Sequence, residues 1–476
     1  MLFNSIHFLV FFVVVTTLFF TLPHRFRWFM LLVASCYFYM VFVPVYILIL
    51  GGTIIVDYFA GIWLEKTTGK KRKWLLVASL VANIGVLAVF KYYNFLNENL
   101  SALLNSFGYE NSIPNLSILL PIGLSFHTFQ AMSYTIEVYR GHQKAERHFG
   151  IYALYVMFYP QLVAGPIERP QNMLHQFYEK HYFKIERVID GLKLMCWGLF
   201  MKLVVADRLA IYVDAAYNNP DKHSGLTLLT ATVFFAFQIY CDFAGYSNIA
   251  IGAARVMGFK LMTNFNRPYF SASISEFWKR WHISLSTWFR DYLYISLGGN
   301  KVSIPRWYFN LFFVFAVSGL WHGANWTFII WGALNGFYLV FAIMSEKPRK
   351  MIGQWLGLSR VPVLNTALQI LITFGLTCFA WIFFRANTTP DSFLIVKKIF
   401  TFSGPLFIGE VQQFAYCIMA ILLLLLIELR QNYFLKTQLP FRTGHWVREQ
   451  LAYAMLIILI LMLGVFDGGQ FIYFQF

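Results

Sequence analysis

The amino-acid sequence predicts an all-α protein that crosses a membrane many times. Of its 476 residues, 58% are hydrophobic, 20% are aromatic and only 13% are charged, and a soluble fold could not bury so much apolar surface. Hydrophobic runs of about 17–22 residues recur along the chain, and each is long enough to cross a bilayer core as a helix. We therefore expect about 11–13 membrane helices, some of them broken or re-entrant.

The first 138 residues are expected to form five spans. The first hydrophobic run has no cleavage-type small residues at its end, so we expect a retained helix and not a secretory signal. The next hydrophobic region is too long for one helix, and Pro44 and Gly51–Gly52 are expected to break it. The expected spans cover residues 3–22, two stretches between 29 and 64, then 74–90 and 118–138.

Basic residues predict which connections face the cytoplasm. The strongest cluster is EKTTGKKRKW at residues 65–74, and further arginines lie at 23–28 and 139–149. These connections fall on one side of the five alternating spans, and basic loops are retained in the cytoplasm. The N-terminus is therefore expected outside. The net charge of +16 is assigned to loops beside anionic membrane lipid and not to binding of nucleic acid.

Beyond residue 138, broken and amphipathic segments are expected among further spans. Residues 150–167 contain Pro160, Gly165 and Pro166, and a re-entrant hairpin is as compatible with them as a full span. Further spans are expected at 191–206, 226–252, 308–344 (broken), 362–384, 411–429 and 451–466. We expect one integral-membrane domain over residues 1–476. Within it, helices at 1–138 precede a catalytic core at 139–344, followed by C-terminal helices and an aromatic tail at 345–476.

The cysteines and short motifs exclude several kinds of site. The five cysteines lie in or beside apolar runs without paired spacing, so we expect neither disulfides nor a metal site. The sequence has no glycine-rich phosphate loop and no serine nucleophile elbow. It also has no visible internal repeat, which disfavours a transporter built from inverted repeats.

A polar and aromatic segment, EFWKRWHISLSTWFRDYLY, surrounds His282. On a continuous helix of about 100° per residue, one sector collects Trp278, Trp281, Leu285, Trp288, Phe289 and Tyr292. His282 falls at the edge of that sector, and Arg280 and Asp291 belong to the polar remainder. We expect this helix to lie along the membrane interface or to line a cavity. An interfacial anchor whose histidine has no chemical role is the alternative that the segment leaves open.

His322 lies within SGLWHGANW, inside a long hydrophobic run. Residues 311–344 would make a helix of about 51 Å, longer than a bilayer core of about 30 Å, so it must tilt or break. Gly319 and Gly323 flank the histidine and are expected to supply the break. Counted from Leu311, His322 would lie about 16 Å into the run, near mid-depth. An ionisable residue there usually serves a function, although a buried histidine that bonds a neighbouring helix is the alternative.

Other polar side chains occur within predicted spans. FQIYCDFAGYSNIAIG carries Asp242, Tyr246 and Asn248, and the span before residue 138 carries His127 and Glu137. They are candidates to line a pocket. For each of them alone, hydrogen bonding between helices is the simpler interpretation.

Several stretches together resemble the membrane-bound O-acyltransferase family, in its bacterial branch that modifies alginate, peptidoglycan and teichoic acids. They are LLPIGLSFHTFQAMSYTIEVYRG, QLVAGPIERP, QIYCDFAGYSNIAIGAARVMGF, NFNRPYFSASISEFWKRWHISLSTWFRDYLYISLGGN, SGLWHGANWTFIIWG and FAWIFFRA. The resemblance extends over most of the chain. It implies a ring of helices with a central tunnel, His322 as the catalytic histidine and His282 as a second one. Trp321, Asn325, Trp278, Arg280, Asp291, Asp242, Tyr246 and Asn248 are the further candidates for tunnel or substrate contacts.

The resemblance also implies a reaction. We expect a bacterial inner-membrane enzyme that takes acetyl from a cytoplasmic thioester, acetyl-CoA or a carrier thioester, and O-acetylates an extracytoplasmic glycan. A partner transferase of the SGNH-hydrolase type is expected outside, and no metal is needed. The C-terminal FIYFQF resembles an aromatic tail motif of this branch, which makes Tyr473 a candidate acyl relay; an aromatic belt is the alternative. The competing function is a proton-coupled transporter with His322, Asp242 and Glu137 as its relay.

Overall fold

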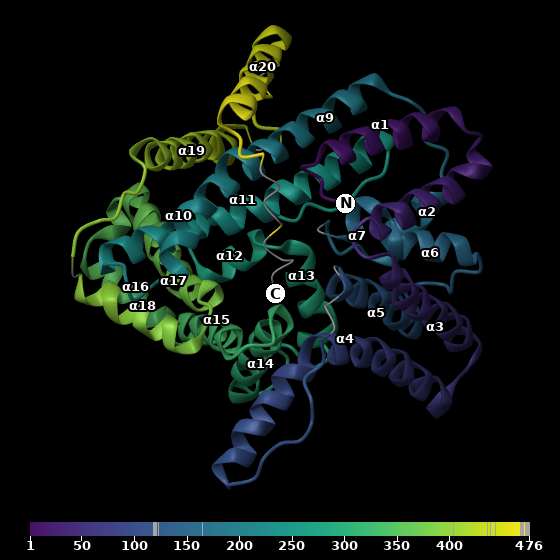
Figure 1. Cartoon of the computed structure of the whole chain (residues 1–476), viewed down its shortest axis with the longest axis horizontal. Helices are drawn as coiled ribbons and strands as arrows, with labels where there is room; N and C mark the ends of the chain where they lie inside the picture. Colours follow the sequence, from purple (N-terminus) through teal and green to yellow (C-terminus); the bar gives the residue numbers. More distant parts are fainter. Residues whose placement is uncertain are drawn as a thin grey trace. The chain divides into compact units, whose positions relative to one another are not determined.

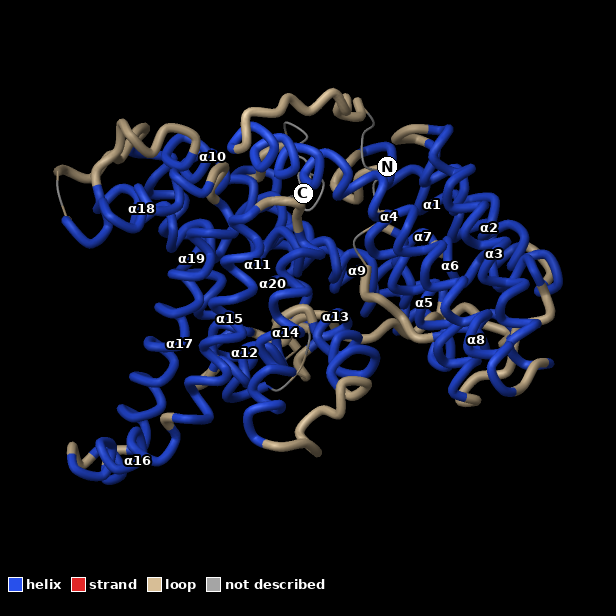
Figure 2. The backbone as a smooth tube through the Cα atoms, turned by 90° about the horizontal axis from the view of Figure 1, so that it is seen from below, coloured by secondary structure: helices blue, strands red, loops and turns tan. Residues whose placement is uncertain are grey.

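The computed structural model describes residues 1–117, 121, 123–163, 165–402, 404–435, 437, 439–442, 444–466 and 471. Every regular element among these residues is a helix, as Figures 1 and 2 show. The chain divides into two compact units. Unit 1 contains residues 1–192 and 250–262, and unit 2 contains residues 193–249 and 263–476.

Unit 1 is built mainly from the N-terminal helices. They are α1 (Ile6–Thr21), α2 (His24–Met40), η1 (Pro44–Tyr46), α3 (Ile47–Lys66), α4 (Gly69–Ser106), α5 (Leu124–Arg140), α6 (Phe149–Met157), α7 (Tyr159–Leu162) and α8 (Pro170–Tyr178). Two long helices, α9 (Ile185–Leu199) and α11 (Gly225–Met257), have residues in both units.

Unit 2 holds the remaining helices. They are η2 (Phe200–Ala206), α10 (Asp207–Tyr217), η3 (Pro268–Phe270), α12 (Ile274–Arg280), α13 (Ile283–Trp288), η4 (Phe289–Tyr294), α14 (Ile304–His322), α15 (Trp326–Met344), α16 (Glu346–Trp355), η5 (Leu358–Arg360), α17 (Pro362–Arg385), α18 (Thr389–Thr401), α19 (Val411–Arg430), η6 (Gln431–Leu435) and α20 (Trp446–Leu463). Three of them, η2, η4 and η6, are π-helical turns.

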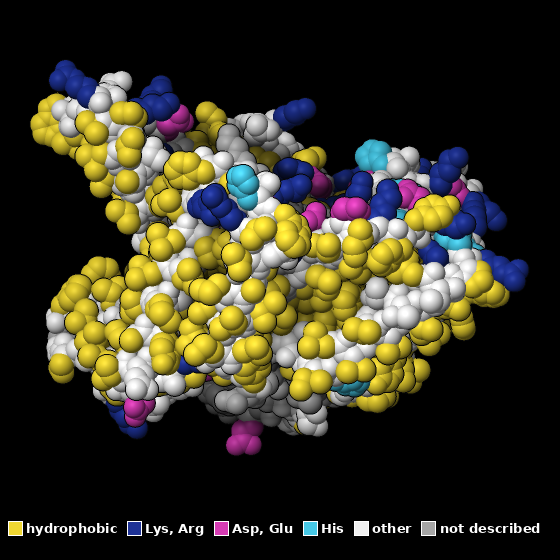
Figure 3. Space-filling model, turned by 90° about the horizontal axis from the view of Figure 1, so that it is seen from above, with side chains coloured by type: hydrophobic (Ala, Val, Ile, Leu, Met, Phe, Trp, Pro, Cys, Tyr) yellow, Lys and Arg dark blue, Asp and Glu magenta, His cyan; other side chains and the backbone are white. Residues whose placement is uncertain are grey.

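Among the described residues, seven helices are long and apolar enough to cross a membrane. They cover Pro44–Lys66, Gly69–Ser106, Gly225–Met257, Trp326–Met344, Pro362–Arg385, Val411–Leu435 and Trp446–Leu463. Many large apolar side chains on these helices are exposed, for example Leu48 at 71% and Val363 at 81%. Figure 3 shows such apolar side chains over most of one face of the molecule. The predicted all-α, multi-pass membrane fold is confirmed.

Three details of the predicted spans are corrected. The chain breaks near Pro44, as expected, but α3 runs straight through Gly51 and Gly52. A side chain at either glycine would meet nothing within 4 Å, so neither position requires a break. Helix α4 has 38 residues and continues past Phe90 to Ser106. Helix α5 begins at Leu124, and part of the expected start of this span lies outside the described residues.

Residues 149–163 form two short helices instead of one span. Helix α6 has nine residues, about 14 Å at 1.5 Å per residue, which is under half of a bilayer core of about 30 Å. Pro160 lies in the first turn of α7, where a missing N–H is tolerated. Almost every side chain from Gly150 to Val163 is buried. Of the two predicted forms, this geometry favours the re-entrant one, because broken backbone at membrane depth requires surrounding protein.

Helix α16 connects two of the membrane-crossing helices, α15 and α17. Its exposed apolar side chains include Met351, Ile352 and Trp355, at 69%, 55% and 85% exposure. Placed at 100° per residue they share one face, while Lys347 and Lys350 lie outside that face. An aromatic residue on one side and basic residues on the other are typical of helices that lie in a membrane interface.

A buried carboxylate ties three helices of unit 1 together. Asp57 of α3 accepts hydrogen bonds from Ser79 Oγ at 2.6 Å and from Asn83 Nδ2 at 2.9 and 3.0 Å, both on α4. Ser79 also lies 3.2 Å from Thr135 Oγ1 of α5. Asp57, Ser79 and Asn83 are at most 1% exposed. The cluster therefore fixes how α3, α4 and α5 pack.

Asp57→Ala should destabilise the protein, because it leaves the two buried donors of Ser79 and Asn83 without their acceptor. Each unsatisfied buried donor costs about 1–3 kcal/mol. The measurement is thermal unfolding of the purified protein in detergent. Asp221→Ala, at an exposed aspartate, is the control and should change the free energy of unfolding by less than about 0.5 kcal/mol. Equal stability of the two variants would contradict a structural role for Asp57.

Candidate active site

His322 lies at the turn of a tightly packed helix hairpin. Helix α14 ends at His322 and α15 begins at Trp326. A Cβ at Gly319 would lie 2.3 Å from the carbonyl oxygen of Phe328, and one at Gly332 would lie 2.4 Å from the carbonyl oxygen of Phe315. The two glycines face each other across the hairpin, so the helix backbones touch. This close contact fixes the position of the turn.

The predicted break beside His322 is confirmed, but only one of the two flanking glycines makes it. Gly323 has extended backbone and ends α14, and a Cβ there would lie 2.1 Å from the ring of Phe328. Asn325 then caps α15 by accepting a hydrogen bond from Thr327 N at 3.0 Å. Gly319 lies inside α14, and its role is close packing. The depth of His322 in a bilayer remains a prediction.

The imidazole of His322 is enclosed by aromatic rings. Its ring centre lies 4.9 Å from that of Trp321, 5.0 Å from that of Trp331 on α15 and 5.4 Å from that of Phe384 on α17. All three contacts are edge-on, and His322 is 5% exposed. The rings hold the imidazole in a poorly hydrated environment, where a proton transfer meets little competition from bulk water.

The helix predicted around His282 is broken at that histidine, which corrects the expectation of one continuous helix. Helix α12 ends at Arg280, and α13 begins at Ile283. Between them, His282 adopts the left-handed conformation, with φ 41° and ψ 55°, which is uncommon for a residue other than glycine. The aromatic face is nevertheless buried: Trp281, Leu285, Trp288, Phe289 and Tyr292 are at most 8% exposed. Strained backbone of this kind is often found at functional sites.

Asn264 holds His282 in place. Its side-chain Oδ1 lies 3.1 Å from Nδ1 of His282, and it accepts hydrogen bonds from Ser284 Oγ at 2.9 Å and Ser284 N at 3.3 Å. Its backbone oxygen accepts from Ile283 N at 2.8 Å. The ring of His282 also packs edge-on against Phe243, with centres 4.6 Å apart.

Burial makes His282 a neutral imidazole. The side chain is 1% exposed, and desolvation lowers its pKa to about 3, because a charged ring would lose its hydration there. The pKa lies below the reference value of about 6.5, so the neutral form predominates near neutral pH. A neutral imidazole has one basic nitrogen and one N–H.

An unbroken series of aromatic contacts in unit 2 links the surroundings of the two histidines. Trp331, which touches His322, stacks on Trp381 at 5.8 Å, and Trp381 lies 5.1 Å from Trp281, the residue before His282. Trp278 lies 5.8 Å from Trp331, so this predicted contact residue joins the wall near His322. Trp321 also belongs to the wall near His322. The structure therefore brings Trp278, Trp321 and the two histidines into one aromatic region.

Asp242 and Tyr246 of α11 belong to a buried charged cluster that also includes Lys202 of η2 and Asp207 of α10. Nζ of Lys202 lies 2.6 Å from Oδ1 of Asp242 and 2.6 Å from Oδ1 of Asp207, and it lies 5.6 Å from the ring centre of Tyr246. Phe471 stacks on Tyr246 with ring centres 4.6 Å apart. This cluster anchors part of the C-terminal tail. Tyr473 lies outside the described residues.

For three other candidate residues, bonding partners within the protein account for the polar side chain without a ligand. Arg280 pairs with Glu276 at 2.6 Å and donates to Asn432 Oδ1 at 3.0 Å. Asp291 pairs with Arg290 at 2.7 Å, and the Arg290 side chain is 60% exposed. Asn248 Nδ2 lies 3.5 Å from the sulfur of Met201. Their proposed contacts with substrate remain predictions.

Sequence reasoning missed Asn264, Lys202, Trp331, Trp381 and Phe384. Trp331 and Phe384 lie within the stretches SGLWHGANWTFIIWG and FAWIFFRA, which carry the family resemblance. The resemblance could therefore have identified them. Asn264 opens the stretch NFNRPYF, and its role depends on a loop that folds back on His282. Nothing in the sequence indicates that Lys202 faces two aspartates on different helices.

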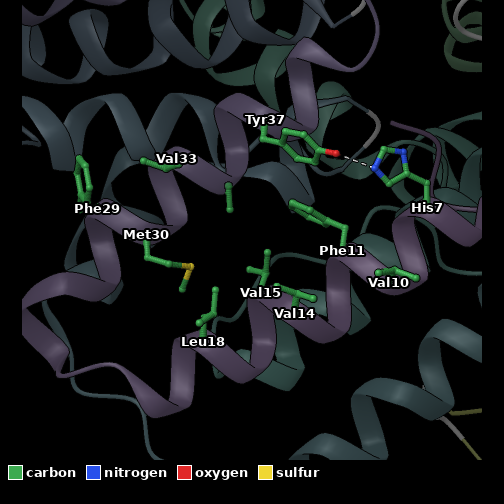
Figure 4. Close-up of a pocket in the computed structure, with 11 residues that line it drawn as sticks. His7, Val10, Phe11, Val14, Val15, Leu18, Phe29, Met30, Val33 and Tyr37 are labelled. Atoms are coloured by element: carbon green, nitrogen blue, oxygen red, sulfur yellow. Dashed lines mark hydrogen bonds between the residues drawn. The ribbon is translucent and has the colours of Figure 1, made fainter.

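The described cavity belongs to unit 1, whereas both histidines belong to unit 2. Residues of α1 and α2 in unit 1 line a groove of about 620 Å³, shown in Figure 4. Its polar members, His7 and Tyr37, bond to each other at 2.9 Å, and the other lining residues are apolar. It contains no charged group that would bind the phosphates of a nucleotide thioester. Among the described residues, no group of histidine, cysteine, aspartate or glutamate could hold a metal ion.

Comparison with known proteins identifies the family of this fold. The family model described as membrane-bound O-acyltransferase matches residues 147–383. The chain is 38% identical over 406 residues to a probable alginate O-acetylase of Pseudomonas aeruginosa, covering 84% of this chain and 75% of the relative. The chain belongs to the membrane-bound O-acyltransferase family.

Two further relatives of this membrane-bound O-acyltransferase act on different acceptors. The peptidoglycan O-acetyltransferase of Helicobacter pylori is 35% identical over 403 residues, covering 79% of this chain and 74% of the relative. The teichoic acid D-alanyltransferase of Bacillus subtilis is 27% identical over 287 residues, covering 58% and 71%. Residues 147–383, which the family model matches, contain both histidines. The chain is therefore an acyltransferase, and the transporter interpretation is set aside.

Proposed function

We propose that the protein is a membrane O-acetyltransferase that moves acetyl from a thioester to a hydroxyl of an extracytoplasmic polysaccharide. Alginate and peptidoglycan are the acceptors named by its relatives. The observation that carries the proposal is His322, a buried imidazole held at a helix turn by three aromatic rings. Acetyl-CoA is the proposed donor. The basic connection at residues 66–73 supports a cytoplasmic donor side, an external N-terminus and an inner-membrane location.

His322 acts as the general base in this proposal. It takes the proton from the acceptor hydroxyl while that oxygen attacks the thioester carbonyl carbon. The carbon–sulfur bond breaks, the proton passes to the leaving thiolate, and an ester and a free thiol remain. Proton transfer of this kind contributes about 10²–10⁴-fold to the rate. Alignment of donor and hydroxyl supplies much of the remainder, because a thioester is already activated.

His282 has a supporting role in the proposed reaction. It orients the donor or the acceptor, or shares the proton with His322. Both histidines are in unit 2, and the aromatic region around them gives this assignment its physical basis. Trp278, Trp321, Asn325, Arg280, Asp291, Asp242, Tyr246 and Asn248 remain proposed tunnel or substrate contacts.

The direct test uses purified protein in lipid vesicles. With radiolabelled acetyl-CoA, the protein should release free acetate slowly or transfer label to added alginate or peptidoglycan fragments. Mass spectrometry of cell-wall and exopolysaccharide fractions from a deletion strain would identify the natural acceptor. Movement of solute without any acetyl release would overturn the proposal.

Transfer to the acceptor can pass through an acyl relay. We propose Tyr473 for this role and an external transferase of the SGNH-hydrolase type as the partner. Phe471, two residues before Tyr473 in the chain, is buried against Tyr246 and Phe243, and Phe243 packs against His282, which supports the proposal. Tyr473→Phe should abolish glycan acetylation in cells and leave acetyl-CoA hydrolysis in vesicles intact. Full glycan acetylation by this variant would remove the relay.

A further inference from the structure

The side chain of Asn264 fixes which nitrogen of His282 carries a proton. The backbone N–H of Ser284 points to the same side-chain atom of Asn264, at 3.3 Å, as does the hydroxyl of Ser284, at 2.9 Å. A backbone N–H can only donate, so this atom must be the amide oxygen. The partner of that oxygen on His282, Nδ1 at 3.1 Å, must therefore be an N–H. In a neutral imidazole, Nε2 is then the nitrogen with the lone pair.

The backbone around His282 supports the same orientation. The carbonyl oxygen of Asn264 accepts from Ile283 N at 2.8 Å, and Asn266 N donates to the carbonyl oxygen of Arg280 at 2.9 Å. These two bonds lie on either side of His282 and hold it in its left-handed conformation. The loop and the amide side chain together hold the ring with Nδ1 toward Asn264.

Only the oxygen of the Asn264 amide group is hydrogen-bonded among the described residues, which indicates a role beyond packing. Its oxygen lies within hydrogen-bond distance of three donors, and its Nδ2 is buried without a hydrogen-bond partner among the described residues. Asn264 itself is 1% exposed. Buried polar groups that serve only the fold are normally paired, so the arrangement is better explained by the demand for an acceptor at Nδ1 of His282.

We propose that Asn264 is a positioning residue that presents Nε2 of His282 as the basic nitrogen toward the reacting groups. The proposal rests on the acetyltransferase function and deepens it. Asn264 acts only through His282. In many enzymes an oxygen that accepts from the second nitrogen of a histidine fixes its tautomer in this way.

The test compares three variants of the full-length protein in lipid vesicles. Asn264→Leu keeps the side-chain size and removes the acceptor. Asn264→Asp keeps an acceptor oxygen. Asn97→Leu is the matched control, because Asn97 is also a buried asparagine, with Nδ2 bonded to the carbonyl oxygen of Ile113 at 2.9 Å in unit 1. The kcat and KM for acetyl transfer are measured for each variant.

Asn264→Leu should lower kcat by about 10- to 100-fold, the range typical when the partner that orients a histidine is lost, with little change in the KM for acetyl-CoA. Asn264→Asp should recover most of kcat. Asn97→Leu should keep the wild-type kcat for its folded fraction. A wild-type kcat for Asn264→Leu, or a failure of Asn264→Asp to recover activity when it folds, would overturn the proposal.

A second measurement does not depend on activity. In nuclear magnetic resonance of protein with isotope-labelled histidine, protonated and bare ring nitrogens have separate signals, and a His282→Gln variant assigns those of His282. The wild type should show Nδ1 protonated and Nε2 bare, and Asn264→Leu should show a mixture. A protonated Nε2 in the wild type would overturn the proposal. If the wild type transfers no acetyl, the proposed function fails, whereas these spectra still decide the role of Asn264.

Discussion

His322→Ala should abolish acetyl transfer while leaving the protein folded in the membrane. The imidazole is the proposed base, and the loss of a general base costs about 10²–10⁴-fold in rate. Radiolabel transfer from acetyl-CoA in vesicles measures the effect, and thermal unfolding in detergent shows that the fold survives. The ring is packed against Trp321, Trp331 and Phe384. His322→Gln fills more of the space between these rings than alanine does, and it should be equally inactive.

His175→Ala provides the matched control for this experiment. His175 lies on α8 in unit 1, with its side chain 57% exposed and 3.7 Å from Glu179. An exposed pair of this kind contributes little to stability, so both activity and unfolding should stay close to wild type. Retained acetyl transfer by His322→Ala would remove His322 from the mechanism. Equal loss in both variants would point to the assay and not to the histidine.

Gly332→Val should prevent correct folding of the α14–α15 hairpin. The first added carbon would lie 2.4 Å from the carbonyl oxygen of Phe315 and 3.1 Å from Cα of Gly319. Both neighbours are backbone atoms, so no side chain can move away, and the helices must separate. Overpacking of this kind costs about 1–3 kcal/mol or more. We expect a large fall in the amount of folded protein and in its unfolding temperature.

Gly375→Ala on α17 is the control for backbone effects. A Cβ at Gly375 would meet nothing within 4 Å, and alanine favours a helix over glycine by about 1 kcal/mol. This variant should be as stable as wild type or slightly more stable. Gly332→Ala, with one carbon added, should be intermediate between Gly375→Ala and Gly332→Val. Wild-type stability of Gly332→Val would contradict the close backbone contact.

The sequence was sufficient to predict the fold class, and it singled out the two histidines around which the proposed site is built. Hydrophobic runs predicted multiple membrane helices, because a bilayer core requires spans of a minimum length. The break beside His322 followed from the excess length of its hydrophobic run. Gly323 and Gly319 look alike in sequence, but one ends a helix and the other packs against Gly332. That difference depends on a partner helix, which periodicity does not describe.

The segment around His282 shows a different limit of sequence reasoning. The aromatic residues were grouped in one sector, most of which the structure buries, but the helical periodicity concealed the break at His282. The break is made by a loop 18 residues earlier in the chain, through the bonds of Asn264 to His282 and Ser284. Local propensity gives no sign of such a contact, because tertiary bonds override it. The same contact explains why Ser284, a polar residue of this segment, is fully buried.

Helix α15 sets a length scale for the site, because it joins the amphipathic helix α16 to the hairpin turn at His322. It has 19 residues, which is about 28 Å at 1.5 Å per residue, against about 30 Å for a bilayer core. If α16 lies in one interface, an upright α15 would place the turn at His322 near the opposite interface, and a tilted α15 would place it nearer the mid-depth that the sequence predicts. The tilt of α15 would therefore decide how far an acceptor hydroxyl must come to reach the imidazole.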